Sequence, residues 1–230
     1  MSSEFIISLL TIIGIDIILG GDNAIVVALA CRKLPPHLRN KAIVAGILLA
    51  IVARAVLTII AVQLLAIPYL MGIGGILLLW IAFRLLTNTE EEHSITGEAK
   101  ISDAIKTIVV ADVVMGFDNV IAVAGASQGN IVLVFLGLII SIPIIIWGSK
   151  IILYLMNKFS FIIYIGAGIL VYTAGKMITH EESVKEMLNQ IGVNVSLFTL
   201  LLVILVILGG WIFNQIKGIQ WFHSRNGRTN

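Results

Sequence analysis

The chain has few charged residues and a single cysteine. Only 12% of its 230 residues are charged and 59% are hydrophobic, against roughly a quarter and a half in soluble domains. Because Cys31 is the single cysteine, the sequence excludes an intrachain disulfide and a metal site built from several cysteines. The net charge of +2 comes from too few residues to form a nucleic-acid-binding surface. A mean hydropathy of +1.06 therefore predicts a chain that lives in a lipid bilayer, without a separate soluble catalytic domain.

Long apolar runs follow one another along the whole sequence. Seven are long enough to cross a bilayer as helices, since a crossing takes about 20 residues. They lack the alternation of membrane β-strands, so we predict an all-α polytopic membrane protein. The first run contains Asp16 and Asp22 and is too long for a cleaved signal peptide, so we expect it to remain as a helix. The predicted spans are residues 5–30, 42–64, 68–87, 104–126, 130–155, 160–179 and 195–216.

Lysine and arginine are distributed unevenly between the two sides that seven crossings define. Twelve fall on one side, only Lys176 and Lys185 on the other, and Arg54 lies inside the second span. By the positive-inside rule the side with twelve is cytoplasmic. We therefore predict a cell-membrane protein with its N-terminus outside and residues 217–230 as a basic cytoplasmic tail. The twelve are Arg32, Lys33, Arg39, Lys41, Arg84, Lys100, Lys106, Lys150, Lys158, Lys217, Arg225 and Arg228.

The two longest connections between predicted spans are rich in acidic residues. They cover residues 88–103 and 180–194. Because runs of charge usually lie on solvated loops, we interpret both as solvated linkers.

The sequence contains an internal repeat. Residues 16–25 (DIILGGDNAI) align with residues 112–121 (DVVMGFDNVI), and Asp, Gly, Asp and Asn are identical. A shared packing pattern would explain the glycines but not the acidic residues. Because each copy holds three spans, the copies enter the membrane from opposite sides, as in many secondary transporters. We predict one membrane domain, 1–230, with seven transmembrane helices: a three-helix repeat (5–87), an inverted one (104–179) and an extra C-terminal helix (195–216).

Both copies place two aspartates and an asparagine inside a predicted span. An ionised aspartate at the centre of a membrane helix costs about 2.5 to 3.5 kcal/mol, so function is the default explanation. The alternative for a single aspartate is a structural role, in which its protonated carboxyl group forms an interhelical hydrogen bond. All the groups offer hard oxygen, which favours Mn²⁺, Mg²⁺ or Ca²⁺ over Zn²⁺ or Cu⁺. The candidate metal ligands are Asp16, Asp22, Asn23, Asp112, Asp118 and Asn119.

A regular helix cannot point all three polar groups of one copy in the same direction. Asp16 and Asn23 share a face, whereas Asp22 lies about 120° away. Unwinding at Gly20-Gly21 in the first copy, or at Gly116 in the second, would turn Asp22 or Asp118 inward and free backbone carbonyls. The alternative is that these glycines are packing notches.

Four carboxylates exceed the charge of one divalent ion, so either some aspartates are protonated or another cation lies nearby. Arg54, deep in the second span, is the candidate counter-ion or gate. If instead an aspartate is protonated when the site is empty, metal binding would release the proton and couple the two flows.

The paired Asp-x5-Asp-Asn motifs at 16–23 and 112–119 resemble those of the TerC family of bacterial integral membrane proteins. The resemblance extends over essentially the whole chain. It implies a manganese-handling membrane protein, either a Mn²⁺ exporter or a supplier of Mn²⁺ to extracytoplasmic enzymes, with no prosthetic group. Family members often have serine two residues before the Asp-Asn pair, where this chain has Gly20 and Gly116, so a hydroxyl ligand is missing there.

Four functions are compatible with these residues. The first is a metal exporter working by alternating access, with the lipid bilayer, a divalent ion and coupled protons as its partners. The second is a non-transporting subunit that delivers or senses metal. The third is an amino-acid exporter, which needs a cationic pocket and less acidic oxygen. The fourth is an intramembrane aspartyl protease, but adjacent asparagines have no part in an aspartyl dyad, so we expect no enzyme.

Overall fold

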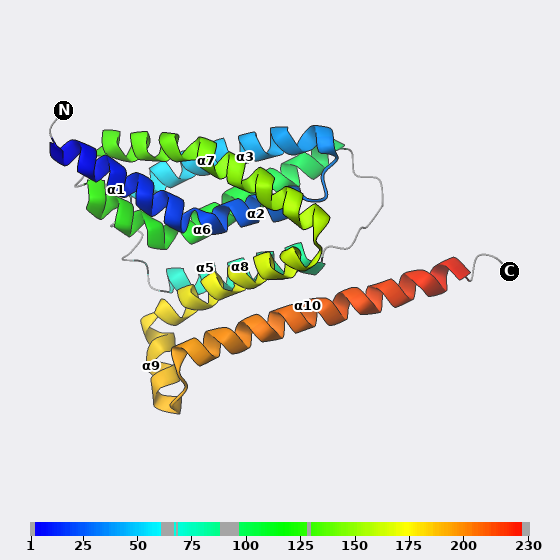
Figure 1. The fold of residues 1–230 in the computed structure, drawn as a ribbon. Coiled ribbons are helices and arrows are strands. Elements are labelled where there is room, and N and C mark those ends of the chain that lie inside the picture. The colour runs from blue at the N-terminus through cyan, green and yellow to red at the C-terminus, as the bar shows by residue number, and fades with distance from the viewer. Residues whose placement is uncertain (1–2, 61–66, 68, 88–96, 128–129, 227–230) are drawn as a thin grey trace.

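The computed structural model describes residues 3–60, 67, 69–87, 97–127 and 130–226. Every regular element within these ranges is an α-helix, which confirms the all-α class (Figure 1). The helices are α1 (Ser3–Leu19), α2 (Gly21–Cys31), α3 (Pro36–Ile59), α5 (Leu70–Thr87), α6 (Gly97–Ser127), α7 (Ile131–Lys158), α8 (Phe161–His180), α9 (Glu182–Ile191) and α10 (Val195–Asn226).

Most of the predicted membrane spans coincide with helices. Among the described residues, α3, α5, α7, α8 and α10 are long and apolar enough to cross a membrane, and α1 with α2 adds a sixth if the bent pair is one span. The remaining predicted span, 104–126, lies inside α6, which has 31 residues. The structure thus supports five or six crossings, and the arrangement of seven stays a prediction.

Two predicted loops contain helix. Residues 180–194 were expected to form a solvated linker, but Glu182–Ile191 is helix α9, with Leu188 buried. Its apolar residues have the spacing of one helix face, i, i+3, i+4 and i+7: they are Val184, Met187, Leu188 and Ile191. Residues 97–103, predicted as part of the other linker, are the first turns of α6. Similarly, α10 runs to Asn226, into the predicted tail.

The helices are stacked in layers (Figure 1). α3 and α7 form one outer layer, α1, α2 and α6 form the next, and the pair α5 and α8 follows. α10 lies beyond them, mainly against α8. Only 11% of the most apolar part of α10 is buried, whereas at least 39% is buried in each of the other four long spans. The layer of α1, α2 and α6, enclosed between the α3–α7 layer and the α5–α8 pair, carries Asp16, Asn23 and Asp112.

Close packing at two glycines fixes α3 and α7 against this enclosed layer. A Cβ on Gly46 of α3 would lie 2.7 Å from Ile108 Cδ1 of α6, and one on Gly137 of α7 would collide with Ile12 Cγ2 of α1. Both isoleucines are buried. Each lies four residues, about one helical turn, before an aspartate of the repeat. The closest approaches between layers are therefore one turn from Asp16 and Asp112.

The first copy of the repeat is broken at a glycine and the second is not. Gly20 is the single turn residue between α1 and α2, whose axes are bent by 43°. A Cβ on Gly20 would collide with the carbonyl oxygen of Asp16, whereas one on Gly21 would meet nothing within 4 Å. α6 continues as helix past Gly116. The unwinding that we considered for both copies is present only in the first.

Candidate functional site

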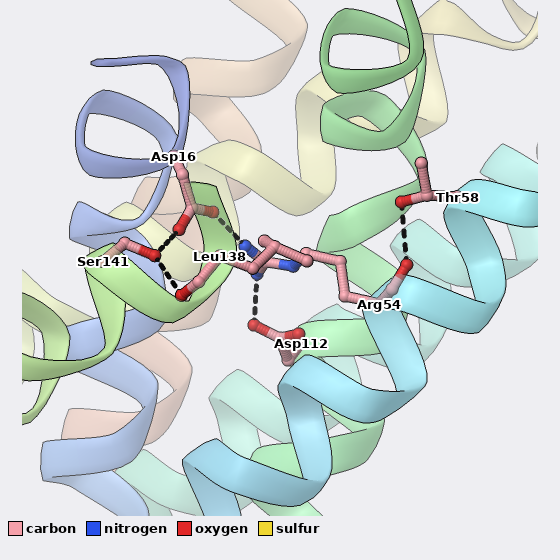
Figure 2. A network of polar contacts seen from close by, with 6 residues as sticks. All are labelled: Asp16, Arg54, Thr58, Asp112, Leu138 and Ser141. Carbon is pink, nitrogen blue, oxygen red and sulfur yellow. Dashed lines mark hydrogen bonds and ion pairs between the residues drawn. The ribbon is translucent and has the colours of Figure 1, made fainter. Parts of the chain in front are cut away.

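Arg54 lies between the two aspartates that begin the repeated motifs (Figure 2). Its Nη1 donates a hydrogen bond to Asp16 Oδ1 and its Nη2 donates to Asp112 Oδ1. All three side chains are buried. The three residues lie on three different helices: Asp16 on α1, Arg54 on α3 and Asp112 on α6. A guanidinium suits this position because its nitrogens form a rigid fork that can pair with two carboxylates at once.

The sequence of α3 delivers Arg54 to this place. Ile47, Ala50, Ile51 and Arg54 follow the spacing i, i+3, i+4 and i+7, so they share one face of the helix. All four line the same cavity. The contact of Gly46 with α6 brings this face close enough for the guanidinium to reach both carboxylates.

Ser141 of α7 holds the second oxygen of Asp16. Its Oγ donates to Asp16 Oδ2 and also lies 2.9 Å from the carbonyl oxygen of Leu138 (Figure 2). Sequence reasoning missed this residue. Serines in apolar helices commonly bond their own backbone, as Ser149 of the same helix does, so a lone serine gives no signal.

A small cavity of about 20 Å³ adjoins the ion pairs. Its walls are mostly apolar, but Asn23, Arg54 and Asp112 reach it. Within the described part of the chain, both polar atoms of the Asn23 side chain, Arg54 Nε and Asp112 Oδ2 have no hydrogen-bond partner. Leaving a buried polar group unsatisfied costs about 1–3 kcal/mol. Such groups call for an explanation, and a bound water or ion is one.

The size and charge of the cavity restrict what it can hold. A water needs at least about 10–15 Å³ by the same measure, so the cavity takes one small ion or water and no amino acid. Two carboxylates and one guanidinium leave the cluster with a net charge of −1 when all are ionised. The unpartnered oxygens of Asn23 and Asp112 come from α2 and α6, so each half of the chain contributes one.

The structure brings together four of the seven residues that the sequence singled out. Asp16, Arg54 and Asp112 form the ion pairs, and Asn23 lines the adjoining cavity. Asp22 is half-buried and points elsewhere: it accepts a hydrogen bond of 2.8 Å from Thr173 Oγ1 of α8. The break at Gly20 therefore does not turn Asp22 toward Asp16 and Arg54, as unwinding there was expected to do. The side chains of Asp118 and Asn119 lie outside the described residues.

Of the predicted metal ligands, the structure describes the side chains of four, and these do not form a metal-binding cluster. Among the side chains that the structure describes, no group of three or more His, Cys, Asp or Glu residues could hold a metal ion. Arg54 occupies the place between the carboxylates where a cation was expected. Metal binding by these residues therefore stays a prediction.

These features define an integral membrane protein with a buried cluster of ionisable residues. The chain matches the integral membrane protein TerC family over residues 1–217 and belongs to that family, as its motifs indicated. It is 45% identical over 217 residues to the uncharacterized membrane protein YjbE of Bacillus subtilis. The match covers 94% of this chain and all of YjbE.

More distant relatives are larger proteins. The chain is 28% identical over 162 residues to the UPF0053 protein YegH of Escherichia coli K12, and 27% identical to the UPF0053 inner membrane protein YoaE of the same strain. Each match covers 62% of this chain and 31% of the relative. No solved structure matches the chain.

Proposed function

We propose that this protein exports a hard divalent cation, most suitably Mn²⁺, by alternating access at the cavity beside Arg54. One observation carries the proposal: Asn23 and Asp112 line one cavity of about 20 Å³, and each has a side-chain oxygen without a hydrogen-bond partner in the part of the chain that the structure describes. Carboxylate and amide oxygens suit Mn²⁺, Mg²⁺ and Ca²⁺. The choice of Mn²⁺ and of export rests on the family resemblance.

Alternating access requires two related halves that move about a shared site, and the packing supports this arrangement. Ile12 corresponds to Ile108 at the repeat offset of 96 residues. Ile12 packs on Gly137 of α7 and Ile108 packs on Gly46 of α3, and each of these glycines lies in the second predicted span of the other half. The two sets of contacts thus exchange roles between the halves, as two inverted repeats of three helices would. We place the N-terminus outside the plasma membrane on the asymmetry of Lys and Arg.

The same cluster argues against the competing functions. An aspartyl protease needs two carboxylates that share a proton, whereas Arg54 pairs with both of these aspartates. An amino-acid exporter needs a larger cavity than about 20 Å³. Transport rather than catalysis is therefore the function that we propose.

Flux and binding of radiolabelled Mn²⁺ by the purified protein in liposomes test the proposal. We expect Asp112→Asn to weaken Mn²⁺ binding at least tenfold and to abolish flux, since changes even in the outer shell of a metal site cost about 10- to 100-fold. Asp22→Asn is the matched control, because Asp22 is bonded to Thr173 away from the cavity. Binding without flux would favour a metal-delivery or sensing subunit. Absence of binding would refute the metal site.

A further inference from the structure

We propose that Arg54 is a tethered cation that alternates with the metal ion at Asp16 and Asp112. The guanidinium pairs with both carboxylates while the protein is empty and leaves them when the metal binds. This inference rests on the proposed function, and it specifies how the empty site is neutralised.

The hydrogen bonds to the carboxylate oxygens favour one cation at a time. Arg54 occupies Asp16 Oδ1 and Asp112 Oδ1, and Ser141 occupies Asp16 Oδ2. Of the four carboxylate oxygens of Asp16 and Asp112, Asp112 Oδ2 is the one without a hydrogen-bond partner among the described residues. With Arg54 in place, a metal ion would therefore gain one carboxylate oxygen and the amide oxygen of Asn23. Ca²⁺, by comparison, takes about 6–8 oxygens and Mg²⁺ six.

The charges lead to the same conclusion. A divalent ion added beside the intact ion pairs would change the net charge of this buried cluster from −1 to +1. An uncompensated charge of either sign is unfavourable in an apolar interior, so adding the ion without moving Arg54 brings no gain in charge balance. If Arg54 withdraws, the two carboxylates match the two charges of the ion, and both Oδ1 atoms become available as ligands.

Few bonds hold Arg54 besides its two ion pairs. Arg54 lines the cavity, and its Nε has no hydrogen-bond partner within the described residues, so one fewer bond opposes its movement. Arg54 is five residues from Ile59, the last residue of α3, which is about 7.5 Å at 1.5 Å per residue. Arginine side chains near a helix end reach out of the apolar layer over such distances.

The exchange would let the empty protein change conformation without a second transported ion. Two bare carboxylates would resist burial, but a guanidinium that is covalently part of the protein keeps them paired. The tethered charge takes the role that we assigned to a proton as one alternative in the sequence analysis.

Two kinds of Mn²⁺ flux in liposomes distinguish this role from a structural one. Exchange of labelled for unlabelled Mn²⁺ needs only the loaded protein to move, whereas net efflux also needs the empty protein to return. In Arg54→Ala we expect exchange to continue, net efflux to fall at least tenfold, and Mn²⁺ to bind about tenfold more tightly. The tighter binding follows because a competing state of the site has been removed.

Chemical rescue provides the matched control. Millimolar guanidinium should restore net efflux in Arg54→Ala and compete with Mn²⁺ for binding, whereas urea, which has the same shape without the charge, should do neither. Unchanged net efflux in Arg54→Ala would overturn the inference. Equal loss of exchange and net efflux, with no effect of guanidinium, would also overturn it and assign Arg54 to structure.

A conservative variant covers the case in which Arg54→Ala does not fold. A lysine keeps the charge but lacks the fork that pairs with both carboxylates. We expect Arg54→Lys to bind Mn²⁺ several-fold more tightly than the parent while keeping net efflux, and unchanged or weaker binding would overturn the inference. Absence of Mn²⁺ binding and flux in the parent protein would instead defeat the proposed function itself, before any Arg54 variant is compared.

Discussion

Ile108 of α6 packs on Gly46 of α3 so closely that a Cβ on the glycine would lie 2.7, 3.2 and 3.3 Å from three side-chain atoms of the isoleucine. The two residues join the helix that carries Arg54 to the helix that carries Asp112. Their contact therefore determines whether the ion pair between these helices can form.

Replacing this glycine should overpack the contact. We expect Gly46→Ala to be less stable than Gly14→Ala by about 1–3 kcal/mol, the usual cost of an extra carbon in a filled core. Gly14 is a matched control because a Cβ there meets nothing within 4 Å. Both variants gain similarly in helix propensity, so the difference isolates packing. Thermal unfolding in detergent measures it, and equal melting temperatures would contradict the close approach.

The break between α1 and α2 should depend on Gly20 and not on its neighbour. A Cβ on Gly20 would collide with the Asp16 carbonyl oxygen, whereas Gly21 has open space. We expect Gly20→Ala to displace the end of α1 and lower Mn²⁺ affinity at least about tenfold, the scale seen when support of a metal ligand is lost. Gly21→Ala should bind as the parent does. Calorimetric titration with Mn²⁺ compares the two, and similar affinities would speak against a role for the break.

Ser141 should matter to the site while Ser149 should not. Both are buried on α7, but only Ser141 donates to a carboxylate, and Ser149 bonds the carbonyl oxygen of Ile145 at 2.7 Å. A hydrogen bond to a charged group contributes about 1.5–3 kcal/mol. We expect Ser141→Ala to lose stability in that range and to change Mn²⁺ affinity several-fold, with affinity unchanged in Ser149→Ala. Melting curves with and without Mn²⁺ report both effects.

Asn23 should show opposite effects on stability and binding. Its amide is buried with neither polar atom bonded to a described residue. Replacing an unsatisfied buried group by an apolar one of similar size removes a penalty of about 1–3 kcal/mol. We therefore expect Asn23→Leu to melt at a higher temperature without metal and to lose the rise in melting temperature that Mn²⁺ gives the parent. A lower melting temperature without metal would show that Asn23 serves the fold.

The sequence was sufficient for most of the long helices and for three residues of the cluster, but not for the way they meet. Apolar length predicted the long helices, and the cost of intramembrane charge singled out Asp16, Asp112 and Arg54. The direction of Asp22 could not be predicted, because the break at Gly20 was expected to turn it inward and it bonds Thr173 of α8 instead. Ser141 could not be found in this way, because its role depends on α7 lying against α1. The helix at α9 could have been found from its apolar spacing and was missed because its acidic residues suggested a linker.

The packing of α3 on α6 and of α7 on α1 and α2 also affects the order in which the protein can assemble during synthesis. A ribosome completes α3 at Ile59 before it begins α6 at Gly97, so the Gly46 face of α3 is made before its partner exists. The contact of α1 with α7 forms later still, because α7 begins only at Ile131. The first half of the chain therefore inserts with its contact faces uncovered and acquires its native core only after the second half has been translated. The two halves mature together, as one cooperative unit, although the repeat divides the sequence between them.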